Sequence, residues 1–108
     1  MIVSRSVIRA KRGHNNDVVA IIKEAIEISK DSQWASACKG YRIYSNYTGD
    51  NSVIIYEEEF ETVADWDNAF RAAMDSGILL NQDDEWWSKY WDLLESWDRD
   101  FWIVEAQG

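Results

Sequence analysis

Three consecutive glutamates end the most apolar stretch of the sequence, and they are the side chains best suited to proton transfer. Glu57, Glu58 and Glu59 follow directly after the apolar run Val53–Tyr56. If this stretch is a strand, alternation sends Glu57 and Glu59 to one face and Glu58 to the other. A carboxyl group that enters an apolar pocket acquires a raised pKa, which suits a general acid or base. Glu57 and Glu59 are therefore candidate catalytic residues.

The same glutamates also have a structural interpretation. Arg5 and Arg9 alternate with valines in the first apolar stretch, so they share a face with apolar side chains and need acidic partners. If the first and third strands are neighbours, Arg5 or Arg9 can pair with Glu57 or Glu59 across the ladder. Both interpretations stay open at the level of sequence.

His14 is the only histidine and Cys38 the only cysteine. A lone histidine can act as a general base, so His14 is a further catalytic candidate, although a histidine in a loop before a helix is commonly just exposed. If one continuous helix separates them, a rise of about 1.5 Å per residue keeps His14 and Cys38 far apart. Cys38 is expected to serve packing. Neither a metal site nor a cofactor is predicted.

Tryptophan is unusually abundant, with seven in 108 residues, and four of the seven fall between positions 86 and 97. Their spacings of three and four indicate a helix, and an aromatic helix over a sheet can form the wall of a pocket for a planar apolar molecule. Core packing is the alternative. Trp86 and Trp87 are adjacent, so they cannot both point straight into one core. The candidate pocket walls are Trp66, Phe70, Trp87, Tyr90 and Trp91.

The elements that would position these residues alternate along the chain. Strands are predicted at Ile2–Lys11, Tyr41–Tyr47, Val53–Phe60 and Phe101–Ala106. One long helix is expected between Gly13 and Gly40, a second from the capping sequence at Thr62, and a third after Asn81 that extends to Trp97. With right-handed crossovers, this order predicts an α+β ferredoxin-like plait, β-α-β-β-α-α-β, with an antiparallel sheet of strand order 4-1-3-2. Residues 1–108 are expected to form a single domain.

Two predicted strands contain unbroken apolar runs, Val53–Tyr56 and Phe101–Val104. An antiparallel sheet with helices on one face normally alternates to polar side chains on the other. Because soluble monomers seldom expose a large apolar patch, the second face is expected to be covered. The prediction is a homodimer formed by sheet-to-sheet packing.

Composition restricts the classes of partner and compartment. The net charge of −9 disfavours nucleic-acid binding, which needs a cationic surface. No stretch approaches the roughly 20 apolar residues of a membrane span, and the sequence starts without the pattern of a signal peptide. With a single cysteine, a cytoplasmic location is expected.

The order of elements, together with two local stretches, resembles the dimeric α+β barrel superfamily, which includes the antibiotic-biosynthesis monooxygenase-like and NIPSNAP-like domains. One stretch is the first strand running into Gly13-His14 and a helix; the other leads from Glu59-Phe60-Glu61-Thr62 into Ala64–Ala69. The resemblance implies a homodimer with two facing sheets that close a barrel, and a pocket between sheet and helices. Haem-degrading members also use a histidine and an asparagine that have no counterparts here.

Two functional hypotheses follow from these observations. The first is a pocket for a small apolar or aromatic molecule, for which the resemblance implies cofactor-independent monooxygenation. The second is a non-enzymatic dimer that serves as an interaction or ligand-carrying module. An enzyme should place at least one ionisable or hydroxyl group inside the cavity, and that feature separates the two hypotheses.

Overall fold

The computed structural model describes the backbone of residues 1–76 and 84–108, and within those ranges the side chains of residues 74, 76 and 84–87 are outside the description. The elements, in chain order, are β1 (Ile2–Ala10), α1 (Asn15–Ser29), α2 (Gln33–Ala37), β2 (Gly40–Ser45), β3 (Val53–Phe60), α3 (Val63–Ser76), α4 (Asp84–Asp92) and β4 (Leu94–Ile103). The strands form one antiparallel sheet in the order β2-β3-β1-β4. This confirms the predicted plait and its strand order.

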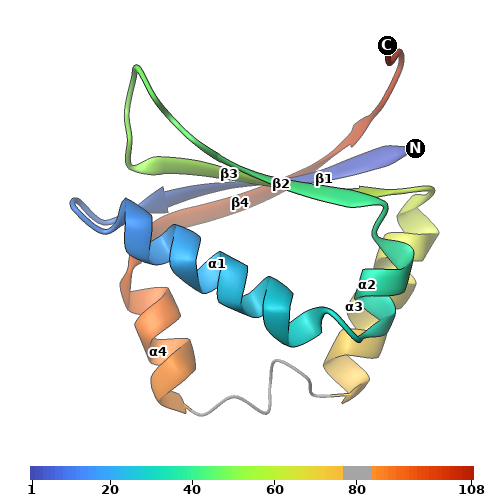
Figure 1. Ribbon diagram of the computed structural model, residues 1–108, viewed down its shortest axis with the longest axis horizontal. Helices are drawn as coiled ribbons and strands as arrows, with labels where there is room; N and C mark the ends of the chain where they lie inside the picture. The colour runs from blue at the N-terminus through green and yellow to red at the C-terminus, as the bar shows by residue number, and fades with distance from the viewer. Residues whose placement is uncertain (77–83) are drawn as a thin grey trace.

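The four helices lie on one face of the sheet (Figure 1). The helix α1 runs along that face, with α4 at one of its ends and α2 and α3 at the other. On β1, alternation separates the two faces: Ile2, Ser4, Ser6, Ile8 and Ala10 are buried beneath the helices, whereas Val7 and Arg9 on the opposite face are exposed. We call the face that carries Val7 the open face.

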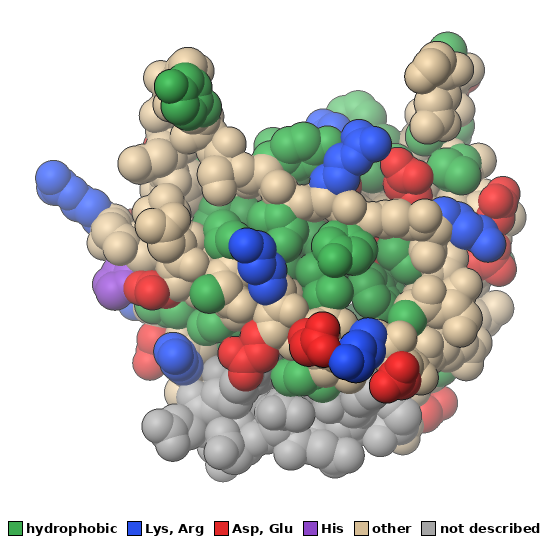
Figure 2. All heavy atoms as spheres, in the orientation of Figure 1, with side chains coloured by type: hydrophobic (Ala, Val, Ile, Leu, Met, Phe, Trp, Pro, Cys, Tyr) green, Lys and Arg blue, Asp and Glu red, His purple; other side chains and the backbone are tan. Residues whose placement is uncertain are grey.

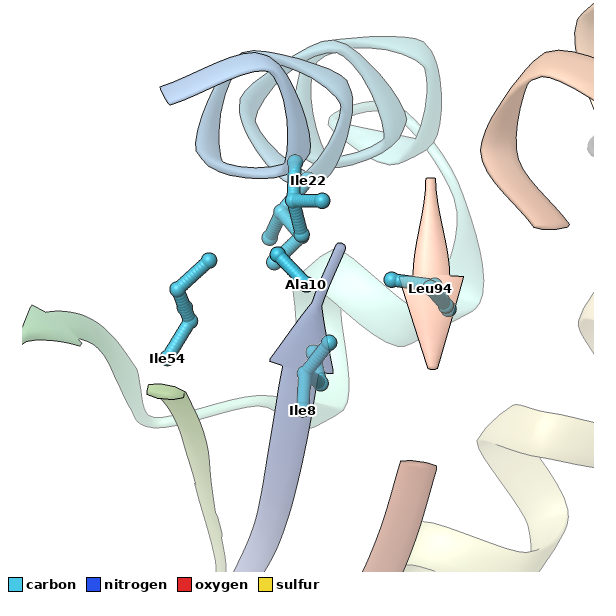
Figure 3. Close-up of a cluster of buried hydrophobic side chains, with 6 residues drawn as sticks. Ile8, Ala10, Ile22, Ile54 and Leu94 are labelled. Atoms are coloured by element: carbon cyan, nitrogen blue, oxygen red, sulfur yellow. The ribbon is translucent and has the colours of Figure 1, made fainter. Parts of the chain in front are cut away.

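The larger of two core clusters lies at one end of the helix-covered face, where Ile22 of α1 points toward the sheet (Figure 3). Its other members include Ile8 and Ala10 from β1, Ile54 from β3 and Leu94 from β4. Burial of such aliphatic side chains contributes roughly 1.5–3 kcal/mol each. This cluster therefore anchors α1 to three strands.

A second cluster lies at the other end of β1 and contains Ile2, Phe60 and Ala69. It fixes α3 against β1 and β3. Between the two clusters, β1 contributes only the small side chains of Ser4 and Ser6 to the helix-covered face. A gap in the apolar core is therefore built into the middle of this strand.

The single long helix predicted between Gly13 and Gly40 is wrong. The chain leaves the helix after Ser29, and the short helix α2 follows. The backbone N–H of Ser32 donates to the carbonyl oxygen of Ser29 at 3.0 Å, and the Ser32 hydroxyl donates to the same oxygen at 2.6 Å. A serine side chain that bonds to local backbone in this way competes with the regular helical ladder.

The start of β4 was also predicted wrongly. This strand begins at Leu94 rather than Phe101, so Trp97 lies in a strand and not in the third helix. Trp97 is opposite Ile8 of β1, and the pairing with β1 continues to the end of β4. Cross-strand pairing therefore overrides the helical spacing of the aromatic residues here. The other three strands begin and end within two residues of their predicted bounds.

Candidate functional site

A cavity of about 340 Å³ lies between the sheet and the helices, and its floor is the gap above Ser6 in the core. Aliphatic side chains from α1, Ile22, Ala25 and Ile26, form one wall. Figure 2 shows hydrophobic side chains gathered between the sheet and the charged outer side of the helices. The volume is at the small end of the range for ligand sites, so it suits a molecule of a few fused rings.

Aromatic side chains form the remaining walls. Trp34 comes from α2, Trp66 and Phe70 from α3, Tyr90 and Trp91 from α4, and Trp97 from β4. The rings of Trp66 and Phe70 stack, with centroids 5.3 Å apart and planes at 13°. The Trp91 ring meets that of Trp97 edge-on at 6.2 Å. Flat, rigid side chains of this kind favour a planar apolar ligand.

Glu58 is the acidic group of the cavity. It lies on β3, is only 7% exposed, and its Oε2 accepts a hydrogen bond from the indole N–H of Trp34. Burial raises the pKa of Glu58 above its usual range, because the charged form loses hydration. The Trp34 hydrogen bond, the positive charge of Arg99 and the Tyr56 hydroxyl oppose this rise in pKa. Glu58 is thus a buried carboxyl group that holds its proton more strongly than an exposed glutamate does, a property that suits a general acid or base.

Tyr56 precedes Glu58 by two residues and faces the same cavity. Burial, followed by the nearby Glu58 charge, strongly raises the pKa of the Tyr56 phenol. Its hydroxyl therefore stays protonated and donates toward the Glu58 carboxylate.

Arg99 of β4 is the basic group of the cavity, and it is held by aromatic rings. Its guanidinium carbon lies 4.8 Å from the centre of the Trp97 ring and 5.4 Å from that of Trp66. The Nε atom is buried and has no hydrogen-bond partner among the described residues. In the ladder, Ser6 lies opposite both Tyr56 on one side and Arg99 on the other. The small serine therefore leaves open space between these two polar side chains.

The candidate pocket residues come together at this cavity. Trp66, Phe70, Tyr90 and Trp91 line it, whereas the side chain of Trp87 lies outside the described residues. At the start of α3, Val63 is 51% exposed and is not among the lining residues.

The catalytic candidates lie elsewhere. Glu57 and Glu59 are on the open face, and Glu57 accepts from the Arg5 guanidinium at 3.2 Å, which confirms the predicted cross-strand pair. His14 is exposed, with its Nδ1 3.0 Å from Asp17 Oδ2. Arg9 pairs with Asp50 in the β2–β3 hairpin rather than with a glutamate of β3. The acid that the cavity contains is instead Glu58.

The sequence contained the signal for Glu58 but not for Arg99. Alternation along β3 already placed Glu58 on the face opposite Glu57. Arg99 could not be placed because the start of β4 was predicted seven residues too late, so its face was undefined. Trp34 was missed because it lies on the short helix α2, in a stretch that was predicted to continue α1.

Cys38 lies outside this group of polar residues. It is half-buried, its thiol donates to the carbonyl oxygen of Gly40 at 3.1 Å, and burial raises its pKa.

Within the described ranges, no three His, Cys, Asp or Glu side chains come together in a group that could hold a metal ion. None of the described helices combines the length and apolar character needed to cross a membrane.

Comparison with known proteins supports the fold. The structure is similar to a NIPSNAP family protein of unknown function from Agrobacterium tumefaciens, with a TM-score of 0.71 and 20% identity over 94% of this chain and 86% of that chain. A protein from Bordetella bronchiseptica, described as a candidate antibiotic biosynthesis monooxygenase, has a TM-score of 0.67 and 16% identity, with 94% of each chain covered. These structural neighbours confirm the fold that the resemblance drawn from the sequence implies. No family model matches the sequence, and no curated protein sequence matches it.

Proposed function

We propose that this protein binds a small planar aromatic molecule in the cavity between its sheet and helices. The observation that carries the proposal is the combination, in one cavity of about 340 Å³, of stacked aromatic walls with a buried carboxyl group. Apolar walls supply most of the binding free energy, and a few fixed polar groups orient the ligand.

The reaction that this cavity supports best is cofactor-independent monooxygenation. The Bordetella bronchiseptica neighbour is described as a candidate antibiotic biosynthesis monooxygenase. Glu58, as the carboxylate, would remove a proton from an acidic CH₂ group that is flanked by aromatic rings. The carbanion would then reduce O₂, so that CH₂ and O₂ become a C=O group and one water molecule. The elevated pKa of Glu58 favours this step, because a base with a pKa nearer the working pH accepts a proton more readily.

A second copy of the chain is the proposed cover of the open face. Trp102, Tyr44 and Val7 on this face are 53%, 40% and 37% exposed. The β2–β3 hairpin and the C-terminal segment both project beyond the sheet on the side away from the helices (Figure 1). Figure 2 shows hydrophobic and charged side chains at the surface between these two projections. Such a mixed patch between projecting arms favours a homodimer formed by sheet-to-sheet packing.

The test uses a variant that fills the cavity. Ala25 of α1 lines the cavity, and Ala20, on the same helix, is exposed. We expect Ala25→Leu to weaken the binding of anthrone, a three-ring ketone with an acidic CH₂ group, by at least about tenfold. Ala20→Leu should leave binding unchanged. Tryptophan fluorescence reports the binding, because four tryptophans line the cavity.

An oxygen electrode in the same experiment separates enzyme from carrier. If the protein is an enzyme, anthrone causes O₂ uptake that Ala25→Leu reduces in parallel with binding. Anthrone binding without O₂ uptake would favour the ligand-carrying module. If Ala25→Leu and Ala20→Leu bind anthrone equally well, the ligand does not occupy this cavity.

A further inference from the structure

We propose that the ligand of this cavity is a planar aromatic carboxylate, and that Arg99 binds its carboxylate group. This inference rests on the proposed function, because it names the chemical class of the molecule that the cavity holds.

Arg99 is a charged side chain placed in apolar surroundings without an acidic partner in contact. Its guanidinium lies against the rings of Trp66 and Trp97, and none of the ion pairs among the described residues involves it. The rings stabilise the charge from their faces, but they do not satisfy the N–H groups at the edge of the guanidinium. Removing such a charge from water costs free energy unless an anion or a hydrogen-bond acceptor binds its N–H groups.

Glu58 does not fill that role within the protein. It is on β3 and Arg99 is on β4, and β1 lies between these strands. Neighbouring strands are about 4.8 Å apart, so two strand spacings separate the two backbones. Glu58 also already accepts a hydrogen bond from the indole N–H of Trp34. The two side chains therefore influence each other through space but leave the gap above Ser6 between them.

A carboxylate fits this gap. The guanidinium is a planar fork whose N–H groups match the two oxygens of a carboxylate. Such a group above Ser6 would lie between the side chains of Arg99 and Tyr56, since Ser6 is opposite both. The aromatic body of the ligand would then extend between α1 and the Trp66–Phe70 stack. Glu58 is the one acidic side chain among the described lining residues, and β1 separates its strand from that of Arg99.

The experiment compares three ligands of similar shape, 2-naphthoate, 2-naphthamide and 2-naphthol. At neutral pH 2-naphthoate is an anion, and 2-naphthamide is its neutral counterpart. We expect wild-type protein to bind 2-naphthoate at least about tenfold more tightly than 2-naphthamide in a titration followed by tryptophan fluorescence. Arg99→Met should remove this preference while leaving 2-naphthamide affinity unchanged or higher. Arg71→Met should keep the preference, because Arg71 is an exposed arginine that pairs with Asp67 on α3.

Each other outcome has a definite meaning. Equal affinities for 2-naphthoate and 2-naphthamide in wild-type protein, or a preference that survives Arg99→Met, would overturn the inference while the cavity proposal stands. Tighter binding of 2-naphthol than of 2-naphthoate would overturn it in favour of a hydroxyl head group. If none of the three ligands binds, the inference fails, and the anthrone titration decides whether the proposed function stands. The ligand comparison needs only wild-type protein, so it holds even if Arg99→Met does not fold.

Discussion

At the scale of single residues, the chemistry of this protein depends on which glutamate of the run Glu57–Glu59 faces the helices. Glu57 is neutralised by Arg5 on the open face, at 3.2 Å. Glu58, one residue later, is buried beside Trp34 and Tyr56 with a raised pKa. Two adjacent and chemically identical side chains thus have different environments, because alternation along the strand places them on opposite faces of the sheet.

The raised pKa of Glu58 leads to a prediction about stability and pH. An acid whose pKa is higher in the folded than in the unfolded state takes up a proton on folding between those two pKa values. Its contribution to the free energy of unfolding is therefore largest below the unfolded-state value, near the ordinary 4.5, and declines as the pH rises from there. We expect Glu58→Gln to remove this decline.

Urea unfolding from about pH 4 to about pH 8 measures the effect. Wild-type protein should lose more stability across this range than Glu58→Gln. The matched control is Glu61→Gln, an exposed glutamate that should follow the wild-type curve. Parallel curves for wild type and Glu58→Gln would mean that Glu58 titrates normally and is not the acid of the cavity.

At the scale of elements, the two faces of the sheet have separate tasks. The helix-covered face builds two core clusters with the cavity between them. The open face carries Val7 and Trp102 together with the Arg5–Glu57 pair, and Arg5 also lies over the Trp102 ring at 5.5 Å. Its apolar side chains remain exposed in a single copy, which is why we expect this face to be an interface.

The dimer prediction tests this interpretation of the open face. We expect sedimentation at concentrations on the order of micromolar to show a wild-type dimer. Val7→Lys places a charge at the centre of the proposed interface and should shift the protein toward monomer. Val63→Lys is the matched control, because Val63 is 51% exposed at the start of α3 and outside the open face. A wild-type monomer, or equal effects of the two substitutions, would contradict sheet-to-sheet dimerisation.

Most elements could be predicted because their signals are local. Apolar runs and turn residues bounded β1, β2 and β3, and a capping threonine marked α3: the Thr62 hydroxyl accepts from the Asp65 N–H at 3.1 Å. The start of β4 could not be predicted, because Leu94–Asp100 is polar and aromatic and becomes a strand only through pairing with β1. The site was therefore half predictable: the aromatic walls on α3 and α4 followed from helical spacing, but Arg99 did not.

At the scale of the whole molecule, the cavity results from the way in which one sheet supports helices at its two ends. The aliphatic cluster of Ile8 and Ile54 fixes α1 at one end, and Phe60 with Ala69 fixes α3 at the other. Ser4 and Ser6 are too small to fill the middle. The central claim is that this space, rather than the open face, receives a small aromatic molecule.

Intermolecular nuclear Overhauser effects between bound 2-naphthoate and methyl groups of the protein test that claim most directly, because they identify the surface that the ligand contacts. We predict contacts from the ring protons to Ile22, Ala25 and Ala69, which line the cavity. Contacts to Val7 and Val53 on the open face, with none to the cavity methyl groups, would contradict it.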